Sequence, residues 1–311
     1  MLLPYTVLLR FQGFLHPTTY PMEQASLFYK TFFYWLHGNP LVEQIEGVFV
    51  VFIQAVWINR IVIRHRLSSV ITLFSGVFYI LLVSLTPGQL GLSPVLIAGF
   101  VFIAVLPSML RIYLVKQAAG DLFNYGFGMA LAGLIYPSYF VVMLSALPGI
   151  AILRSIKLKE ILQWMGGVIA VVFFGGLGFS MWGMEEEFFS GLLDWNGALV
   201  AGLRHLNVWN GLYLFILGFA VLVVFLNTQV VMRNIAYKER KKWKVLFWVL
   251  IFAVLSVFFA PGLDWYPVNV IAVPLSMALG TIASKTKNNL LLEIVHVLLL
   301  IGILFLHSTI N

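Results

Sequence analysis

Long stretches without Asp, Glu, Lys or Arg dominate the chain. The longest are 67–110, 122–153, 161–184 and 205–232, and two more, 245–284 and 290–307, carry one acidic residue each. Roughly 20 apolar residues in a helix cross the hydrocarbon core of a bilayer. Apolar and polar positions do not alternate in these stretches, which predicts spanning helices rather than the strands of a barrel.

Turn-rich segments divide two of these stretches. Residues 86–94 split the first one, and 261–264 split the stretch 245–284. Shorter apolar segments at 1–16 and at about 44–62 come before them. The pattern therefore predicts an all-α bundle of about 11 transmembrane segments, which form one integral membrane domain over residues 1–311.

The stretch 122–153 is too long for one crossing and short for two. Pro137 lies in its middle, and small residues such as Gly126, Gly128 and Gly133 would let two helices approach closely. We expect a broken helix pair here, either re-entrant or crossing twice.

Composition agrees with a membrane location. Hydrophobic residues make up 61% of the chain, charged residues only 10%, and mean hydropathy is +0.98. These values exclude a soluble globule and a disordered chain. The net charge of +7 is explained by loop charges, so no nucleic-acid partner is expected. The absence of cysteine excludes disulfides and thiolate metal sites.

Basic residues fall on one side of this arrangement. Of the 19 Lys and Arg residues, 16 lie in five segments: 60–66, 111–116, 154–159, 233–244 and 285–287. The loops 17–43 and 183–207, on the opposite side, are rich in aromatic and acidic residues. By the positive-inside rule, the basic loop 233–244 and the N-terminus are cytoplasmic and the C-terminus is external. This split requires 122–153 to enter and leave on the basic side.

Candidate chemistry lies near the first segment. Arg10 is a charge inside an apolar run, so it either reaches the interface or lines a cavity, where it could bind a lipid phosphate. Glu23 is the candidate catalytic residue, because a partly desolvated external carboxylate can serve as a general base toward a hydroxyl. Otherwise it is a solvated loop acid. Glu23 or Glu43 could pair with Arg10.

Further polar residues are candidates for an external cavity. They are His16, Glu43, Asp194, Arg204 and His205. Glu185–Glu187 form a solvated loop or, alternatively, bind a divalent cation through oxygen ligands. No other metal site is expected. Lys238–Lys244 would attract anionic lipid or dock a partner.

Several segments resemble the C superfamily of membrane glycosyltransferases, which use polyprenyl-phosphate sugars. They are Leu8–Leu15 followed by an external acid, Phe123–Pro137, and the span that opens with Lys159-Glu160. The resemblance implies a similar fold, with Glu23 as the base that assists sugar transfer on the external face. The second external acid of that superfamily has no counterpart in 86–94, which is uncharged.

A second resemblance is to a family of uncharacterised bacteroidete multi-pass inner-membrane proteins. It rests on Asn59-Arg60, Arg64-His65-Arg66, Leu85-Thr-Pro87 and Leu92-Ser-Pro94. It implies the bacterial inner membrane and a role in the cell envelope. Three functions stay open: action on lipid-linked glycans, a non-catalytic subunit of an envelope-assembly, secretion or motility complex with membrane-protein partners, and a small-molecule transporter.

Overall fold

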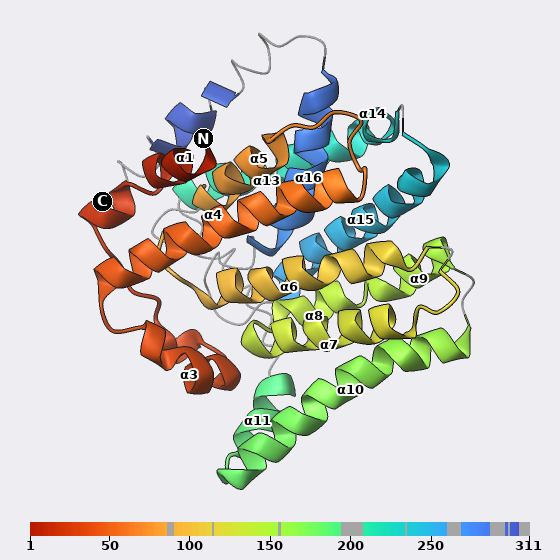
Figure 1. The fold of residues 1–311 in the computed structure, drawn as a ribbon. Coiled ribbons are helices and arrows are strands. Elements are labelled where there is room, and N and C mark those ends of the chain that lie inside the picture. Colours follow the sequence, from red (N-terminus) through yellow and green to blue (C-terminus); the bar gives the residue numbers. More distant parts are fainter. Residues whose placement is uncertain are drawn as a thin grey trace.

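The computed structural model describes residues 1–85, 90–113, 115–154, 157–193, 208–233, 235–259, 269–286, 296–297 and 299–304. Every regular element in these ranges is a helix, which confirms the all-α prediction (Figure 1). The elements are α1 (Leu2–Leu9), α2 (Gln12–Leu15), η1 (Met22–Gln24), α3 (Leu27–Phe33), η2 (Tyr34–Leu36), α4 (Pro40–Arg64), α5 (Phe74–Ser84), α6 (Pro94–Arg111), α7 (Ala119–Ile135), α8 (Ser138–Met143), α9 (Ala146–Leu153), α10 (Leu158–Met181), α11 (Glu185–Leu193), α13 (Val208–Leu226), α14 (Thr228–Met232), α15 (Tyr237–Ser256), η3 (Val257–Phe259) and α16 (Asn269–Lys285).

Three of the described helices, α4, α6 and α10, are long and apolar enough to cross a membrane. Shorter apolar helices cover 74–84, 138–153, 211–226 and 269–285. These lengths are compatible with a membrane protein, and the number of about 11 segments stays a prediction. Helix α6 is the most central of the three, with 61% of its apolar window buried, whereas the corresponding value for α10 is 22%.

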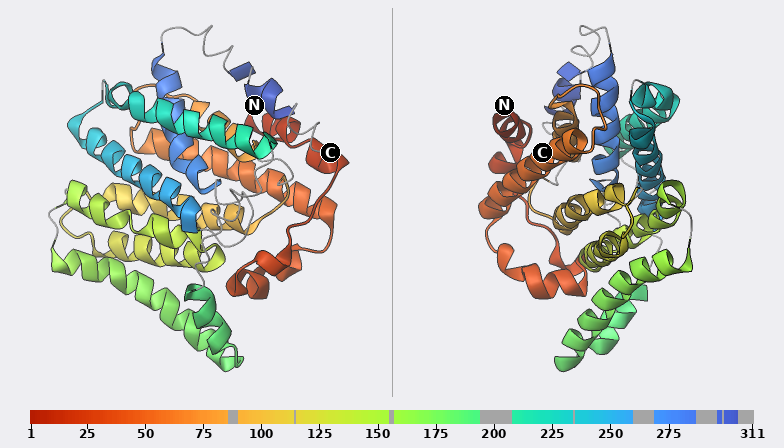
Figure 2. Two further views of the ribbon diagram at one scale, coloured as in Figure 1. Left: turned by 180° about the vertical axis from the view of Figure 1, so that it is seen from behind. Right: turned by 45° about the vertical axis from the view of Figure 1, so that its right-hand side comes forward.

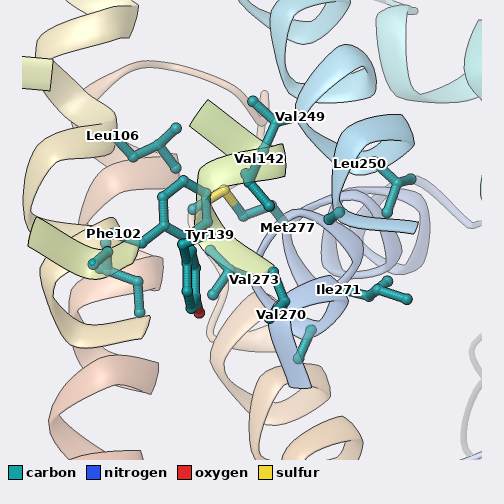
Figure 3. Close-up of a cluster of buried hydrophobic side chains, with 14 of the residues drawn as sticks. Phe102, Leu106, Tyr139, Val142, Val249, Leu250, Val270, Ile271, Val273 and Met277 are labelled. Carbon is teal, nitrogen blue, oxygen red and sulfur yellow. The ribbon is translucent and has the colours of Figure 1, made fainter. Parts of the chain in front are cut away.

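The core forms where α6, α8, α15 and α16 meet. Tyr139 of α8 is almost fully buried, and its ring lies 5.7 Å from that of Phe102 of α6. Figure 3 shows how side chains from the four helices fill this region: Phe102, Leu106, Tyr139, Val142, Val249, Leu250, Val270, Ile271, Val273 and Met277. Helices that are far apart in the sequence therefore pack around one common core.

The chain reverses direction at Tyr136–Pro137, as the proline in this stretch predicted. Helix α7 ends at Ile135, and α8 and α9 run back beside it (Figure 1). The hydroxyl of Ser26 donates hydrogen bonds to the carbonyls of Leu134 and Ile135, at 2.7 and 3.0 Å. These bonds satisfy carbonyls that the end of α7 leaves without helical partners.

Glycines bring α7 and α10 into backbone contact. A Cβ atom built on Gly126 would lie 2.2 Å from the carbonyl oxygen of Trp164, and one on Gly167 would lie 2.2 Å from that of Phe123. The sequence predicted close packing at the glycines of α7. Their partners lie on several helices, because Gly128 faces Val105 of α6.

Contacts join the basic segments at one end of the molecule, which we call the basic end (60–66, 111–113, 115–116, 154, 157–159, 233, 235–244 and 285). The pairs that link them are Lys242–His65, Arg154–Ile112, Lys285–Arg233 and Lys241–Tyr113. In the first three, a basic side chain donates to a backbone carbonyl. The grouping of basic segments on one side, inferred from sequence, therefore holds for these residues.

The opposite, aromatic end consists of residues 18–46, 90–93, 134–137 and 179–189. Figures 1 and 2 show α3 beside the end of α10 and α11 here, and the ring of Phe32 lies 6.3 Å from that of Phe179. The segment 17–43, expected to be a loop, contains short helices and the first turn of α4. Glu43 thus belongs to a membrane-length helix rather than to a loop.

Candidate functional site

A buried chain of polar side chains lies at the aromatic end. The carboxylate of Glu43 is completely buried, and its Oε2 lies 3.2 Å from Nδ1 of His37, at ion-pair distance. The other ring nitrogen of His37, Nε2, lies 2.7 Å from the hydroxyl of Tyr29. We call these residues the Glu43–His37–Tyr29 chain.

The starts of two helices position Glu43 and Tyr29, and His37 directly follows η2. Asn39 caps α4, accepting a hydrogen bond from the amide of Leu41, and Pro40 occupies the first turn. Glu43 lies in the same turn, where the positive end of the helix dipole stabilises a carboxylate. Ser26 caps α3 by accepting from the amide of Tyr29 at 3.2 Å. The local sequence therefore determines the positions of Glu43 and Tyr29, the two end members of the Glu43–His37–Tyr29 chain.

The surroundings of Tyr29 determine the protonation state of its hydroxyl. Burial raises the pKa of the Tyr29 phenol above its ordinary value, and Tyr20, Glu43 and Glu46 raise it further. Tyr29 therefore keeps its proton, and its hydroxyl shares a hydrogen bond with Nε2 of His37. Nδ1 of His37 lies at ion-pair distance from Glu43 and has no hydrogen-bond partner among the described residues. A carboxylate, an imidazole and a hydroxyl in this order can hold or move a proton.

A second acid lies one helical turn further along α4. Glu46 is three residues after Glu43, so the two side chains share a face. Glu43 Oε1 and Glu46 Oε2 are both buried and have no hydrogen-bond partner among the described residues. A buried oxygen without a hydrogen-bond partner lowers the stability of the fold by about 1–3 kcal/mol. Unsatisfied groups of this kind are typical of functional positions.

The backbone around Leu90 connects Arg10 to this site. Arg10 is fully buried, and its Nε and Nη2 donate to the carbonyl of Leu90 at 3.0 and 2.5 Å. Two residues later, the amide of Leu92 donates to the carbonyl of Glu43 at 3.0 Å. Arg10 therefore lies in the protein interior and not at the membrane interface. There it binds the segment 90–92, which packs on the start of α4.

The other predicted site residues lie apart from this chain. Glu23 and His16 are exposed, and the ammonium of Lys30 donates to the backbone carbonyl of Glu23. Glu185–Glu187 form the first turn of α11. Asp194, Arg204 and His205 lie outside the described residues. Within the described part of the chain, no three His, Asp or Glu side chains form a group suited to a metal ion.

An apolar groove lies on the other side of α3. This α3–α10 groove has a volume of about 520 Å³ and lies between α3, α7 and α10. Its lining includes Phe28, Phe32, Phe127, Phe179 and Trp182. Phe28 and Phe32 are one turn apart, and Tyr29 follows Phe28 directly. The short helix α3 therefore borders the groove and the buried chain at once.

The sequence did not single out His37, Tyr29 or Glu46. The signal that could have found them is local: Asn39-Pro40 marks a helix start, so Glu43 and Glu46 share one face directly after it, with His37 just before. The pairing of His37 with Tyr29 depends on how the short helices fold over α4, which spacing alone does not give.

The chain matches no known family model, no curated protein and no solved structure.

Proposed function

We propose that the protein acts at the external face of a bacterial inner membrane on a glycan linked to polyprenyl phosphate. The α3–α10 groove holds the isoprenoid chain, and Glu43 is the acid–base group. The observation that carries this proposal is the double role of α3, which places Phe28 and Phe32 in the groove and Tyr29 in the buried chain.

Glu43 fits the role of a base better than Glu23 does. A base that works near neutral pH needs an environment that differs from water. Glu23 is exposed, whereas Glu43 is buried beside His37. In the proposed reaction, the acceptor hydroxyl loses its proton to Glu43 while its oxygen bonds to the anomeric carbon. The bond from that carbon to the phosphate oxygen breaks, and polyprenyl phosphate leaves. Residues 16–39 cover Glu43 and open to admit the substrate.

The separation of the two ends of the molecule supports the proposed orientation. Basic side chains gather at one end and the candidate site lies at the other, so the positive-inside rule makes the site external. The finer topology belongs to the same proposal: about 11 segments, a fold like that of the C superfamily, and an external C-terminus.

A transfer assay tests the acid–base assignment. Membranes containing the wild-type chain, Glu43→Gln or Glu23→Gln receive a labelled polyprenyl-phosphate sugar, and transfer to membrane glycan is measured. We expect Glu43→Gln to lower transfer by about 10²-fold or more, the usual contribution of a general base, and Glu23→Gln to leave it unchanged. Unchanged transfer in a folded Glu43→Gln protein would contradict the assignment.

A groove-filling variant tests lipid binding separately. A Cβ on Gly178, which lines the groove, meets no atom within 4 Å, so Gly178→Leu adds side-chain volume at the groove with no clash at the Cβ atom. Gly218 in α13 is equally open and provides the control variant Gly218→Leu. With a photoreactive polyprenyl phosphate, we expect reduced crosslinking only for Gly178→Leu. Equal crosslinking in both variants would place the lipid elsewhere.

The exposed position of α10 favours a second candidate function, that of a non-catalytic subunit. Phe173 and Phe174 are 57% and 67% exposed on this helix, which is little buried by the rest of the chain. A partner helix would cover them. This alternative predicts a membrane protein that copurifies in mild detergent and is lost in Phe173→Ala/Phe174→Ala, while transfer does not depend on Glu43.

A further inference from the structure

Cationic side chains from three helices surround one buried histidine at the basic end. His65 follows the last residue of α4 and is 6% exposed. The ammonium of Lys242, from α15, donates to its carbonyl at 3.0 Å. Arg64 of α4 and Arg111 of α6 are the other cations that act on its ring.

The ring of His65 is incompletely satisfied. Its Nε2 is buried and has no hydrogen-bond partner among the described residues. Burial and, to a smaller extent, the positive charges of Lys242, Arg111 and Arg64 together lower the pKa of His65 to about 4. The ring is therefore neutral at physiological pH. Its Nε2 atom can donate or accept a hydrogen bond, and three cationic side chains act on the ring.

Nearby acids balance only part of this charge. Asp121 forms an ion pair with Arg111 at 2.7 Å, and Glu239 acts on Lys242. Arg64 and Arg66 are exposed, and no ion pair to either is found within the described residues. An anion with several oxygens would complete the arrangement, because it can accept from the imidazole N–H and from guanidinium groups together.

The surroundings indicate a lipid as the source of this anion. The segment that follows His65 exposes large apolar side chains: Val70 is 47% exposed, Ile71 79% and Leu73 51%. On the other side, Trp243 is buried and donates its indole N–H to the carbonyl of Leu67 at 2.8 Å. Apolar groups beside cations at the end of a membrane-length helix are typical of the headgroup region of a bilayer.

We propose that the phosphate of an anionic membrane lipid binds at the end of α4, accepting a hydrogen bond from Nε2 of His65 and contacting Arg64, Arg111 and Lys242. This site is at the opposite end of the molecule from the candidate glycan site and does not depend on it. Bound there, the lipid would hold the ends of α4, α6 and the start of α15 together.

The titration of His65 tests the proposal in the intact chain. The protein carries ¹⁵N-labelled histidine and is placed in nanodiscs of phosphatidylcholine with or without phosphatidylglycerol, and the ring signals are followed with pH by NMR. An anion within hydrogen-bond distance raises a histidine pKa by about 1–3 units. We therefore expect the pKa of His65 to rise with phosphatidylglycerol. His16, exposed at the other end, measures the general effect of surface charge.

Three outcomes would overturn the proposal. The first is an equal rise at His16 and His65, and the second is no rise at His65. The third is the same rise at His65 when inorganic phosphate is added to phosphatidylcholine nanodiscs, because the ligand would then be a free anion. As a second measurement, native mass spectrometry should show several-fold less retained phosphatidylglycerol for Arg64→Gln/Arg111→Gln than for the control Arg60→Gln. Equal retention would likewise contradict the site.

Discussion

The contact between α7 and α10 makes a sharp prediction, because adjacent glycines in α10 face different surroundings. A Cβ on Gly167 would lie 2.2 Å from the carbonyl oxygen of Phe123 and 2.7 Å from the amide nitrogen of Phe127. A Cβ on Gly166 would meet only a ring carbon of Phe123, at 4.0 Å. We therefore compare Gly167→Ala with Gly166→Ala.

The magnitude follows from these distances. Non-bonded heavy atoms pack best at about 3.5–4.0 Å, so Gly167→Ala forces the two helices apart by about 1 Å. Such overpacking costs about 1–3 kcal/mol. Both variants gain up to about 1 kcal/mol of helix propensity, and this gain cancels in the comparison. Gly167→Ala should therefore be less stable than Gly166→Ala by about 1–3 kcal/mol.

Thermal unfolding of the two purified variants in the same detergent measures this difference. For chains of about 150–250 residues, each kcal/mol corresponds to about 2–4 °C in Tm, so we expect a gap of several degrees. Gly166→Ala should unfold at or slightly above the wild-type temperature. If both variants unfold at the same temperature, the two backbones are not in contact at Gly167 and the geometry of the α3–α10 groove would need revision.

Three more predictions follow from single contacts. Ser26→Ala removes the N-cap of α3 and the hydrogen bonds to the end of α7. It should lower the free energy of unfolding, measured by chemical denaturation, by about 1–2 kcal/mol. An unfolding midpoint equal to that of the wild type would refute the capping role. The pKa of His65 is about 4 in the folded state, against an ordinary value of 6.5. Between these two values the unfolded chain binds a proton that the folded chain does not. The free energy of unfolding contributed by His65 is therefore complete above pH 6.5 and is lost as pH falls toward 4. His65→Gln should flatten this pH dependence in phosphatidylcholine nanodiscs, and an unchanged slope would assign it to other groups. Trp243→Phe leaves the carbonyl of Leu67 without its donor and should lower stability by about 1–3 kcal/mol, measured by Tm; no change would mean that water replaces the indole.

The sequence pattern was sufficient for the helical class and for the sorting of charge. Apolar runs of this length have few alternatives, and Lys and Arg are too costly in lipid to be placed at random. The reversal at Pro137 was also readable, because proline cannot continue the hydrogen-bond ladder of a helix.

The candidate site was less readable, for physical reasons. Glu43 looked like a loop acid because carboxylates are rarely buried unless paired, and its partner His37 is defined only by tertiary folding. Arg10 carried two interpretations, and its position against the carbonyl of Leu90 depends on a backbone 80 residues away. Patterns along a chain report which groups are costly to bury, but not which distant group offsets the cost.

The carbonyl contacts of the basic end bear on how the chain enters its membrane. Lys242, Arg154 and Lys285 each hold a backbone oxygen of another segment. The residues expected to direct insertion are thus also those that tie neighbouring segments together once inserted. A single segment inserted in the wrong direction would place the two members of such a pair on opposite sides of the bilayer. Faulty insertion of that segment would then also prevent it from packing against its neighbours.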